Sequence, residues 1–99
     1  MPLWTRKWPF VDYSVEAAPL DSGVYGLWKD GELIYIGSSN GPESSIRSRL
    51  MEHLRAGMDP RPDHYSWEVA ADPAKRRAES LEQFRNLHKR LPRLNREKP

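Results

Sequence analysis

Two short apolar runs, 23–28 and 32–37, are rich in β-branched and aromatic side chains. Runs of this length and composition predict strands. The residues between them include Asp30-Gly31, and an Asp-Gly pair at such a place is a strong signal for a tight hairpin turn. The two runs are therefore expected to pair as neighbouring antiparallel strands.

The register of this hairpin is open between two alternatives. A two-residue turn pairs Lys29 with Glu32. In that register the two tyrosines of the runs, Tyr25 and Tyr35, point to opposite faces of the sheet. A three-residue loop pairs Trp28 with Glu32 and puts the same tyrosines opposite each other on one face. Because side chains alternate along a strand, one residue of register decides between these arrangements.

A helix is predicted over about 44–56, because apolar residues recur there at a spacing of four. The residues of this stripe are Ile46, Leu50 and Leu54. Ser44 or Ser45 is expected to cap the start of the helix, and Gly57 lies where a helix stop belongs.

The second half of the chain predicts a third strand and a second helix. Apolar and polar residues alternate over 65–70, which indicates a half-buried strand. Asp72 and Pro73 form a helix start, with the aspartate as cap and the proline in the first turn. The helix is expected to run to about Leu91, because Pro92 stops it. Its expected core side consists of Ala74, Ala78, Leu81, Phe84, Leu87 and Leu91.

The length of 99 residues allows a single domain with one modest core. The order of elements predicts an α/β fold, β-β-α-β-α, with a three-stranded sheet flanked by helices. Residues 1–20 form an N-terminal extension whose aromatic side chains, including Trp4 and Trp8, are expected to pack on the core. Stacking of these tryptophans on nucleic-acid bases is the alternative. Residues 96–99 are expected to fray as a basic tail.

Composition excludes several kinds of chemistry. The chain has no cysteine, which rules out disulfides, thiolate metal sites and cysteine nucleophiles. No apolar stretch reaches the roughly 20 residues of a membrane span, and the N-terminus lacks the apolar core of a signal peptide. We therefore expect a cytoplasmic protein with no membrane partner.

Charge is distributed unevenly along the chain. The formal net charge is +2, yet residues 71–99 hold nine of the sixteen Lys and Arg residues and four of the fourteen acidic residues. This basic end indicates either a polyanionic partner or a solvated helix face followed by a frayed tail. Among its basic residues, Lys89 and Arg90 are expected to contact a phosphate backbone.

Four sequence features follow one another in a characteristic order. They are Gly23-Val24-Tyr25, then Tyr35-Ile36-Gly37 after nine intervening residues, a basic–x–Arg–apolar–x–x–His pattern over 47–53, and a late helix with glutamates that leads to Pro92-Arg93-Leu94-Asn95. Over residues 21–95 this order resembles the GIY-YIG nuclease superfamily, whose two tripeptides lie on neighbouring strands. Val24 replaces the isoleucine of the family motif.

The resemblance implies a DNA endonuclease that hydrolyses phosphodiester bonds with one Mg²⁺ or Mn²⁺ ion. Both tripeptide tyrosines of the family reach the active site, which favours the three-residue hairpin loop. Tyr35 is then the expected base or proton relay, and Tyr25 positions water or phosphate. Arg49 matches the catalytic arginine, which stabilises charge on the phosphate oxygens. His53 is expected to share the work of the base or to hold the phosphate.

The metal-binding glutamate is where the chain departs from this pattern. In close relatives, such as the nuclease domain of the excinuclease of nucleotide-excision repair, it lies nine residues before the proline of the last motif, where this chain has Gln83. Glu82 is the preferred replacement, since its neighbours keep the family pattern and it lies nearer the expected core side. Glu79 is the alternative ligand. The resemblance also makes Arg47 and Asn95 candidate substrate contacts.

The predicted function is thus a metal-dependent DNA endonuclease. Members of the superfamily that the chain resembles act in DNA repair, recombination, restriction and intron mobility. The sequence does not indicate which of these processes applies here. Specificity is expected to come from the nuclease surface, from dimerisation or from a partner protein. Two other classes stay open. One is a catalytically inactive nucleic-acid-binding module, and the other is a protein-interaction domain that docks its partner through Trp4 and Trp8.

Overall fold

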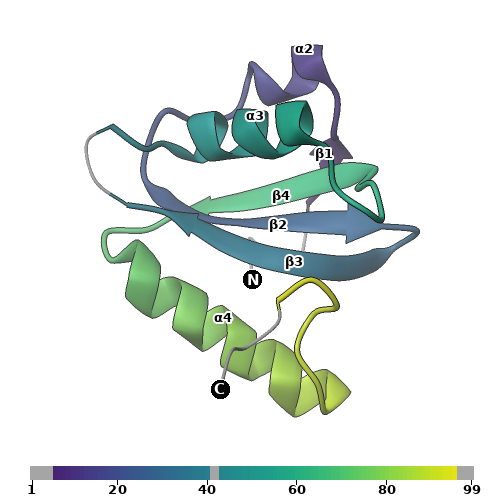
Figure 1. The fold of residues 1–99 in the computed structure, drawn as a ribbon. Coiled ribbons are helices and arrows are strands. Elements are labelled where there is room, and N and C mark those ends of the chain that lie inside the picture. Colours follow the sequence, from purple (N-terminus) through teal and green to yellow (C-terminus); the bar gives the residue numbers. More distant parts are fainter. Residues whose placement is uncertain (1–5, 41–42, 96–99) are drawn as a thin grey trace.

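A four-stranded antiparallel sheet separates α3 on one face from α4 on the other (Figure 1). The computed structural model describes residues 6–40 and 43–95. The elements in chain order are β1 (Trp8–Pro9), α2 (Asp12–Val15), β2 (Gly23–Lys29), β3 (Glu32–Ser39), α3 (Ile46–Ala56), β4 (His64–Val69) and α4 (Pro73–His88). The strand order is β1-β4-β2-β3, so β3 lies at an edge of the sheet. The α/β class is confirmed, and the order β-β-α-β-α holds from β2 to α4, with β1 and α2 preceding it as elements that were not predicted.

The predicted three-stranded sheet is wrong by one strand. Residues Trp8–Pro9 of the N-terminal extension pair with β4 and add a short edge strand. A proline donates no backbone hydrogen bond, and it is tolerated at an edge of this kind. The ring of Trp8 stacks on Tyr65 and Trp67, with centroid distances of 6.0 and 5.5 Å. Trp4 and residues 96–99 lie outside the described residues.

Each face of the sheet carries its own apolar core. The core on the side of α2 and α3 is built from Phe10, Val15, Ala18, Tyr25, Leu27, Ile34, Ile46, Leu50 and Tyr65. The core on the side of α4 is built from Val24, Trp28, Leu33, Ile36, Leu81 and Phe84. Within the described part of the chain, no helix is both long and apolar enough to cross a membrane.

The helix α3 begins with a reciprocal cap. The Ser45 Oγ accepts a hydrogen bond from the backbone N–H of Ser48 at 3.0 Å, and the Ser48 Oγ accepts one from the backbone N–H of Ser45 at 2.9 Å. These two bonds satisfy donors that a helix start otherwise leaves unpaired. Of the two expected caps, Ser45 is the one used. Gly57 follows the last helical residue, as predicted.

The helix α4 begins as predicted, but the face that it buries coincides with the expected core side only in part, at Leu81 and Phe84. Asp72 caps it, accepting a hydrogen bond from the Lys75 N–H at 3.2 Å. Its last helical residue is His88, before the expected end at Leu91, because Lys89 adopts a left-handed conformation. The buried residues of the helix are Pro73, Ser80, Leu81 and Phe84, whereas Ala74, Ala78 and Leu87 of the expected core side are exposed. The stripe that packs on the sheet thus runs along the helix through Pro73, Ser80 and Phe84.

The turn of the hairpin is that of the first alternative, but the register beyond Ile34 corresponds to neither alternative. The turn has two residues, and Lys29 pairs with Glu32. Asp30 and Gly31 both have positive φ, 51° and 80°, as such a tight turn requires. After the next pair, Trp28 with Leu33, the register between β2 and β3 shifts by one residue, because Ile34 has no partner on β2.

This irregularity at Ile34 changes which side chains share a face. Beyond it, Leu27 pairs with Tyr35 and Tyr25 pairs with Gly37. Tyr25 and Tyr35 therefore lie on the same face of the sheet, with ring centroids 6.2 Å apart. The three-residue loop is thus wrong, but the shared face for which it was chosen is confirmed. A bulge of one residue moves the side chains that follow it to the opposite face of the sheet.

Candidate active site

A tyrosine–histidine pair lies between the sheet and α3. The hydroxyl of Tyr25, on β2, lies 2.8 Å from Nε2 of His53, on α3. Tyr35, on β3, packs against the same imidazole with a centroid distance of 5.4 Å. Three elements thus bring Tyr25, Tyr35 and His53 together, as the resemblance implies for these positions.

A glycine makes room for the phenol of Tyr25. A Cβ atom on Gly37 would lie 2.4 Å from both Cζ and the hydroxyl oxygen of Tyr25, and 2.8 Å from Cε2 of Tyr35. Real Cβ atoms do not approach other heavy atoms so closely. The phenol of Tyr25 therefore crosses the sheet directly over the bare backbone of Gly37, and this path leads its hydroxyl to His53.

Burial sets the protonation of the pair. Tyr25 is fully buried. Burial, and next the neighbouring Tyr35, raise the pKa of Tyr25 above its ordinary value, and Arg49 acts in the opposite direction. Burial, and next the positive charge of Arg49, lower the pKa of His53. At neutral pH the hydrogen bond therefore joins a neutral phenol to a neutral imidazole. The phenol donates to Nε2 when the proton of the ring is on Nδ1.

The lowered pKa of His53 predicts how stability depends on pH. The unfolded chain binds a proton at His53 more readily than the folded protein does, so stability rises with pH through this titration and falls as the pH is lowered. Lowering the pH from about 7.5 to about 5.5 is expected to lower the unfolding temperature, with a smaller fall in His53→Gln. NMR titration of His53 should give a midpoint below 6.5. A midpoint above this value contradicts the prediction, and the exposed His64→Gln is the matched control.

A polar groove opens beside this pair. It has a volume of about 410 Å³ and is lined by Tyr35, Ser38, Asn40, Ser44, Arg49 and Arg77. The hydroxyl and amide groups offer hydrogen bonds, and the two guanidinium groups supply positive charge. A groove with this lining suits an anion such as phosphate, because the planar guanidinium of arginine binds two phosphate oxygens with two parallel hydrogen bonds.

The protein does not use all the hydrogen-bond donors of Arg49. Its Nη1 pairs with Glu52 at 3.2 Å, but the Glu52 side chain is 66% exposed, and an exposed pair of this kind is weak. Its Nε is buried and has no hydrogen-bond partner among the described residues. Tyr25 raises the pKa of Arg49, first by electrostatic interaction and also by a side-chain hydrogen bond, and an arginine is charged at neutral pH in any case. Arg49 is thus available to a ligand in the groove.

The predicted substrate contacts hold the fold together in this structure. The Arg47 Nε donates to the carbonyl of Ala18 at 2.8 Å. Asn95 is buried, with its side chain bonded to both backbone groups of Ile36. Lys89 caps the C-terminal end of α4, and Arg90 reaches Glu32 at 3.4 Å.

Lys89 and Arg90 also lie far along α4 from the groove. Lys89 follows Arg77 by twelve residues, which is about 18 Å along a helix. The structure therefore does not bring Lys89 and Arg90 to the cluster around Tyr25.

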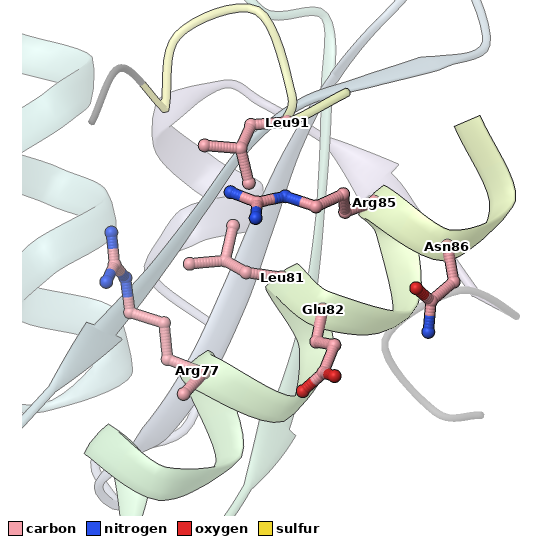
Figure 2. Close-up of a pocket in the computed structure, with 7 residues that line it drawn as sticks. Arg77, Leu81, Glu82, Arg85, Asn86 and Leu91 are labelled. Carbon is pink, nitrogen blue, oxygen red and sulfur yellow. The ribbon is translucent and has the colours of Figure 1, made fainter. Parts of the chain in front are cut away.

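The two candidate metal ligands lie away from the groove. Glu82 is exposed and lines a neighbouring hollow of about 380 Å³, which shares Arg77 with the groove but none of the other groove residues. Figure 2 shows its carboxylate and the guanidinium of Arg77 leaving the helix in different directions. Glu79 pairs with Arg76 at 3.3 Å. The rotation of the buried stripe of α4 explains this outcome, because it turns Glu82 toward solvent.

The residues that line the groove do not fit a Mg²⁺ site. Mg²⁺ takes oxygen ligands, usually one or two carboxylates, and this groove presents two guanidinium groups and no carboxylate among the described residues. Elsewhere in the described ranges, 6–40 and 43–95, no three His, Asp or Glu side chains gather closely enough to hold a metal ion.

Sequence reasoning missed Arg77 as a groove residue. By sequence, Arg77 is one of many basic residues of the second helix, and the predicted core side of that helix matches the buried one only at Leu81 and Phe84. The available signal was spacing: Arg77 lies three residues before the buried Ser80 and seven before the buried Phe84, which is the spacing of one helix face.

Comparison with known proteins adds no assignment. No protein-family model matches the chain, and no curated protein matches it with significant similarity.

Proposed function

We propose that this chain is an endonuclease that hydrolyses phosphodiester bonds in DNA, of the GIY-YIG type that its motifs resemble. The observation that carries the proposal is the cluster of Tyr25, Tyr35 and His53 from three elements, beside a polar groove that Tyr35 and Arg49 line. These are the residue types that hydrolysis of a phosphodiester needs: a hydrogen-bonding relay, a fixed positive charge and a group that can accept a proton.

Each residue has a distinct part in the proposed reaction. Arg49 binds the oxygens of the scissile phosphate and stabilises the charge that builds up on them in the transition state. The oxygen of a water molecule attacks phosphorus as the bond to the leaving sugar oxygen breaks. Tyr35, which lines the groove, relays the proton of that water by accepting it as its own phenolic proton passes to solvent, and solvent protonates the leaving oxygen. Tyr25 stays protonated and holds His53 in place.

The proposed reaction needs no Mg²⁺ or Mn²⁺ ion in the groove. The resemblance implies one such ion, but the lining of the groove does not fit it, so the proposed steps run through side chains alone.

A second candidate function is nucleic-acid binding without cleavage. It is favoured by one observation: α4 presents Arg77 to the groove, and neither Glu82 nor Glu79 lines it. Such a groove retains phosphate, and the salt dependence of binding would be steep because each phosphate contact releases counterions.

The test is cleavage of supercoiled plasmid and of labelled single-stranded DNA, each with Mg²⁺, Mn²⁺ or EDTA. The decisive variant is Tyr35→Phe, and its matched control is Tyr13→Phe, since Tyr13 is 76% exposed and outside the groove. We expect the parent and Tyr13→Phe to cleave and Tyr35→Phe to be defective.

Two other results would contradict the proposed endonuclease. Folded parent protein that binds DNA in a salt-sensitive way but never cleaves it supports the second candidate. Protein that neither binds nor cleaves either substrate overturns both candidates. Glu82→Ala belongs in the same series, because loss of cleavage there would restore Glu82 as a metal ligand.

A further inference from the structure

We propose that Arg49 and Arg77 form a two-arginine clamp that binds a phosphate of the DNA backbone without a divalent cation. This inference rests on the proposed function, because it states what holds the substrate in the same groove. It assigns to Arg77 a binding role that neither the sequence motifs nor the resemblance gives it.

Arg77 reaches the groove from α4, which packs on the opposite face of the sheet from α3 (Figure 1). On the way, its Nε donates a hydrogen bond to the carbonyl oxygen of Ile36 at 3.2 Å. Ile36 lies between Tyr35 and Gly37, so Arg77 is attached to the tripeptide that carries the candidate base. With Nε occupied, the two terminal nitrogens of the guanidinium stay available to a ligand.

The Ile36 carbonyl, to which Arg77 is bonded, is itself held in place by Asn95. The Asn95 Nδ2 donates to the same Ile36 carbonyl at 2.9 Å, and the Asn95 Oδ1 accepts from the Ile36 N–H at 2.7 Å. Asn95 is 5% exposed. A buried side chain with two bonds fixes the position of the carbonyl, and through it the guanidinium of Arg77. Such preorganisation reduces the entropic cost of binding.

The charges of the groove are not balanced by the protein. Across the described residues, Arg77 has no carboxylate partner, and Arg49 has the exposed Glu52 on one nitrogen and none on its buried Nε. Two guanidinium groups that line one groove repel each other unless an anion lies between them. A phosphate group supplies that anion and matches the planar fork of each arginine.

The same charges disfavour a cation. A divalent ion in this groove would face two positive side chains with no carboxylate to offset them. Binding of DNA should therefore be at least as tight in EDTA as in Mg²⁺.

The experiment measures binding of fluorescent phosphorothioate DNA, single-stranded and duplex, by anisotropy in EDTA over a series of salt concentrations. The decisive variant is Arg77→Gln, whose amide keeps a donor for Ile36 but lacks the charge. We expect an affinity about 10-fold or more below the parent's, and a salt slope smaller by about one phosphate contact. The matched control is Arg85→Gln, on the same helix and exposed, with an expected loss of at most about twofold.

Circular dichroism and thermal unfolding confirm that both variants are folded, and Arg77→Lys tests geometry, since it keeps the charge without the fork. Parent-like affinity of folded Arg77→Gln overturns the clamp and leaves the proposed function standing. Binding that requires Mg²⁺ also overturns it. Absence of DNA binding by the parent under every condition overturns the proposed function, and the clamp with it.

Discussion

Replacing Arg49 with alanine is expected to slow DNA cleavage by about 100-fold to 1,000-fold while leaving the protein folded. The guanidinium lines the groove, and its charge opposes the negative charge that develops on the phosphate. Its side chain is 38% exposed and its ion pair with Glu52 lies at the surface, so its loss removes little packing. Arg49→Lys should recover little activity, because an ammonium group lacks the planar fork of the guanidinium.

Single-turnover cleavage of plasmid DNA, at saturating protein, separates this effect from weaker binding. Arg55→Ala is the matched control, since Arg55 is an exposed arginine on the same helix and does not line the groove. Thermal unfolding of both variants should stay close to that of the parent. If folded Arg49→Ala cleaves within about threefold of the parent, the transition state is stabilised elsewhere and the proposed role of Arg49 is wrong.

Replacing Gly37 with alanine is expected to destabilise the protein by about 3 kcal/mol and to abolish cleavage. The added Cβ would lie 2.4 Å from two atoms of the Tyr25 phenol and 2.8 Å from the ring of Tyr35. Tyr25 is fully buried and bonded to His53, so its ring cannot yield without breaking that bond. The strain is purely steric, and it falls on the two tyrosines of the candidate site.

Chemical denaturation measures this loss, and Gly31→Ala provides the comparison. Gly31 has a φ of 80° and open space around its Cβ position, so that variant tests backbone strain alone, at about 1 kcal/mol. A double-mutant cycle locates the clash, because the cost of Gly37→Ala should shrink in a Tyr25→Leu background. Additive costs would mean that the phenol of Tyr25 is not what the new methyl group meets.

The elements of this fold were predictable because local signals marked them. Alternation and β-branched residues marked the strands, a serine cap and a glycine stop marked α3, and Asp72 with Pro73 marked the start of α4. The irregularity at Ile34 had no such signal, because it arises where the register set by the tight turn meets the register that the two cores impose. The pairing of β1 involves two residues, too few for a pattern.

The site was predictable where it depends on the periodicity of α3 and on the resemblance, and not where it depends on the rotation of α4. Helical spacing places His53 on the side of α3 that flanks its apolar stripe, whereas Tyr25 and Tyr35 share a face because of the irregularity at Ile34, which the resemblance indicated and strand periodicity left open. Leu81 and Phe84 of the predicted stripe of α4 are buried, but Pro73 and Ser80 are buried with them in place of the predicted alanines and Leu87. A helix with few large apolar residues gives a weak signal of its rotation, and the placement of Glu82 and Arg77 depended on it.

The contacts of Leu94 and Asn95 with β3 also protect the edge of the sheet. The backbone N–H of Leu94 donates to the carbonyl of Ile34 at 2.9 Å, and the side chain of Asn95 occupies both backbone groups of Ile36. Hydrogen-bonding groups that a bare edge strand would offer to a strand from another molecule are thus already used. The strand that carries Tyr35 is thereby shielded from edge-to-edge association, although it is the last strand of an open sheet.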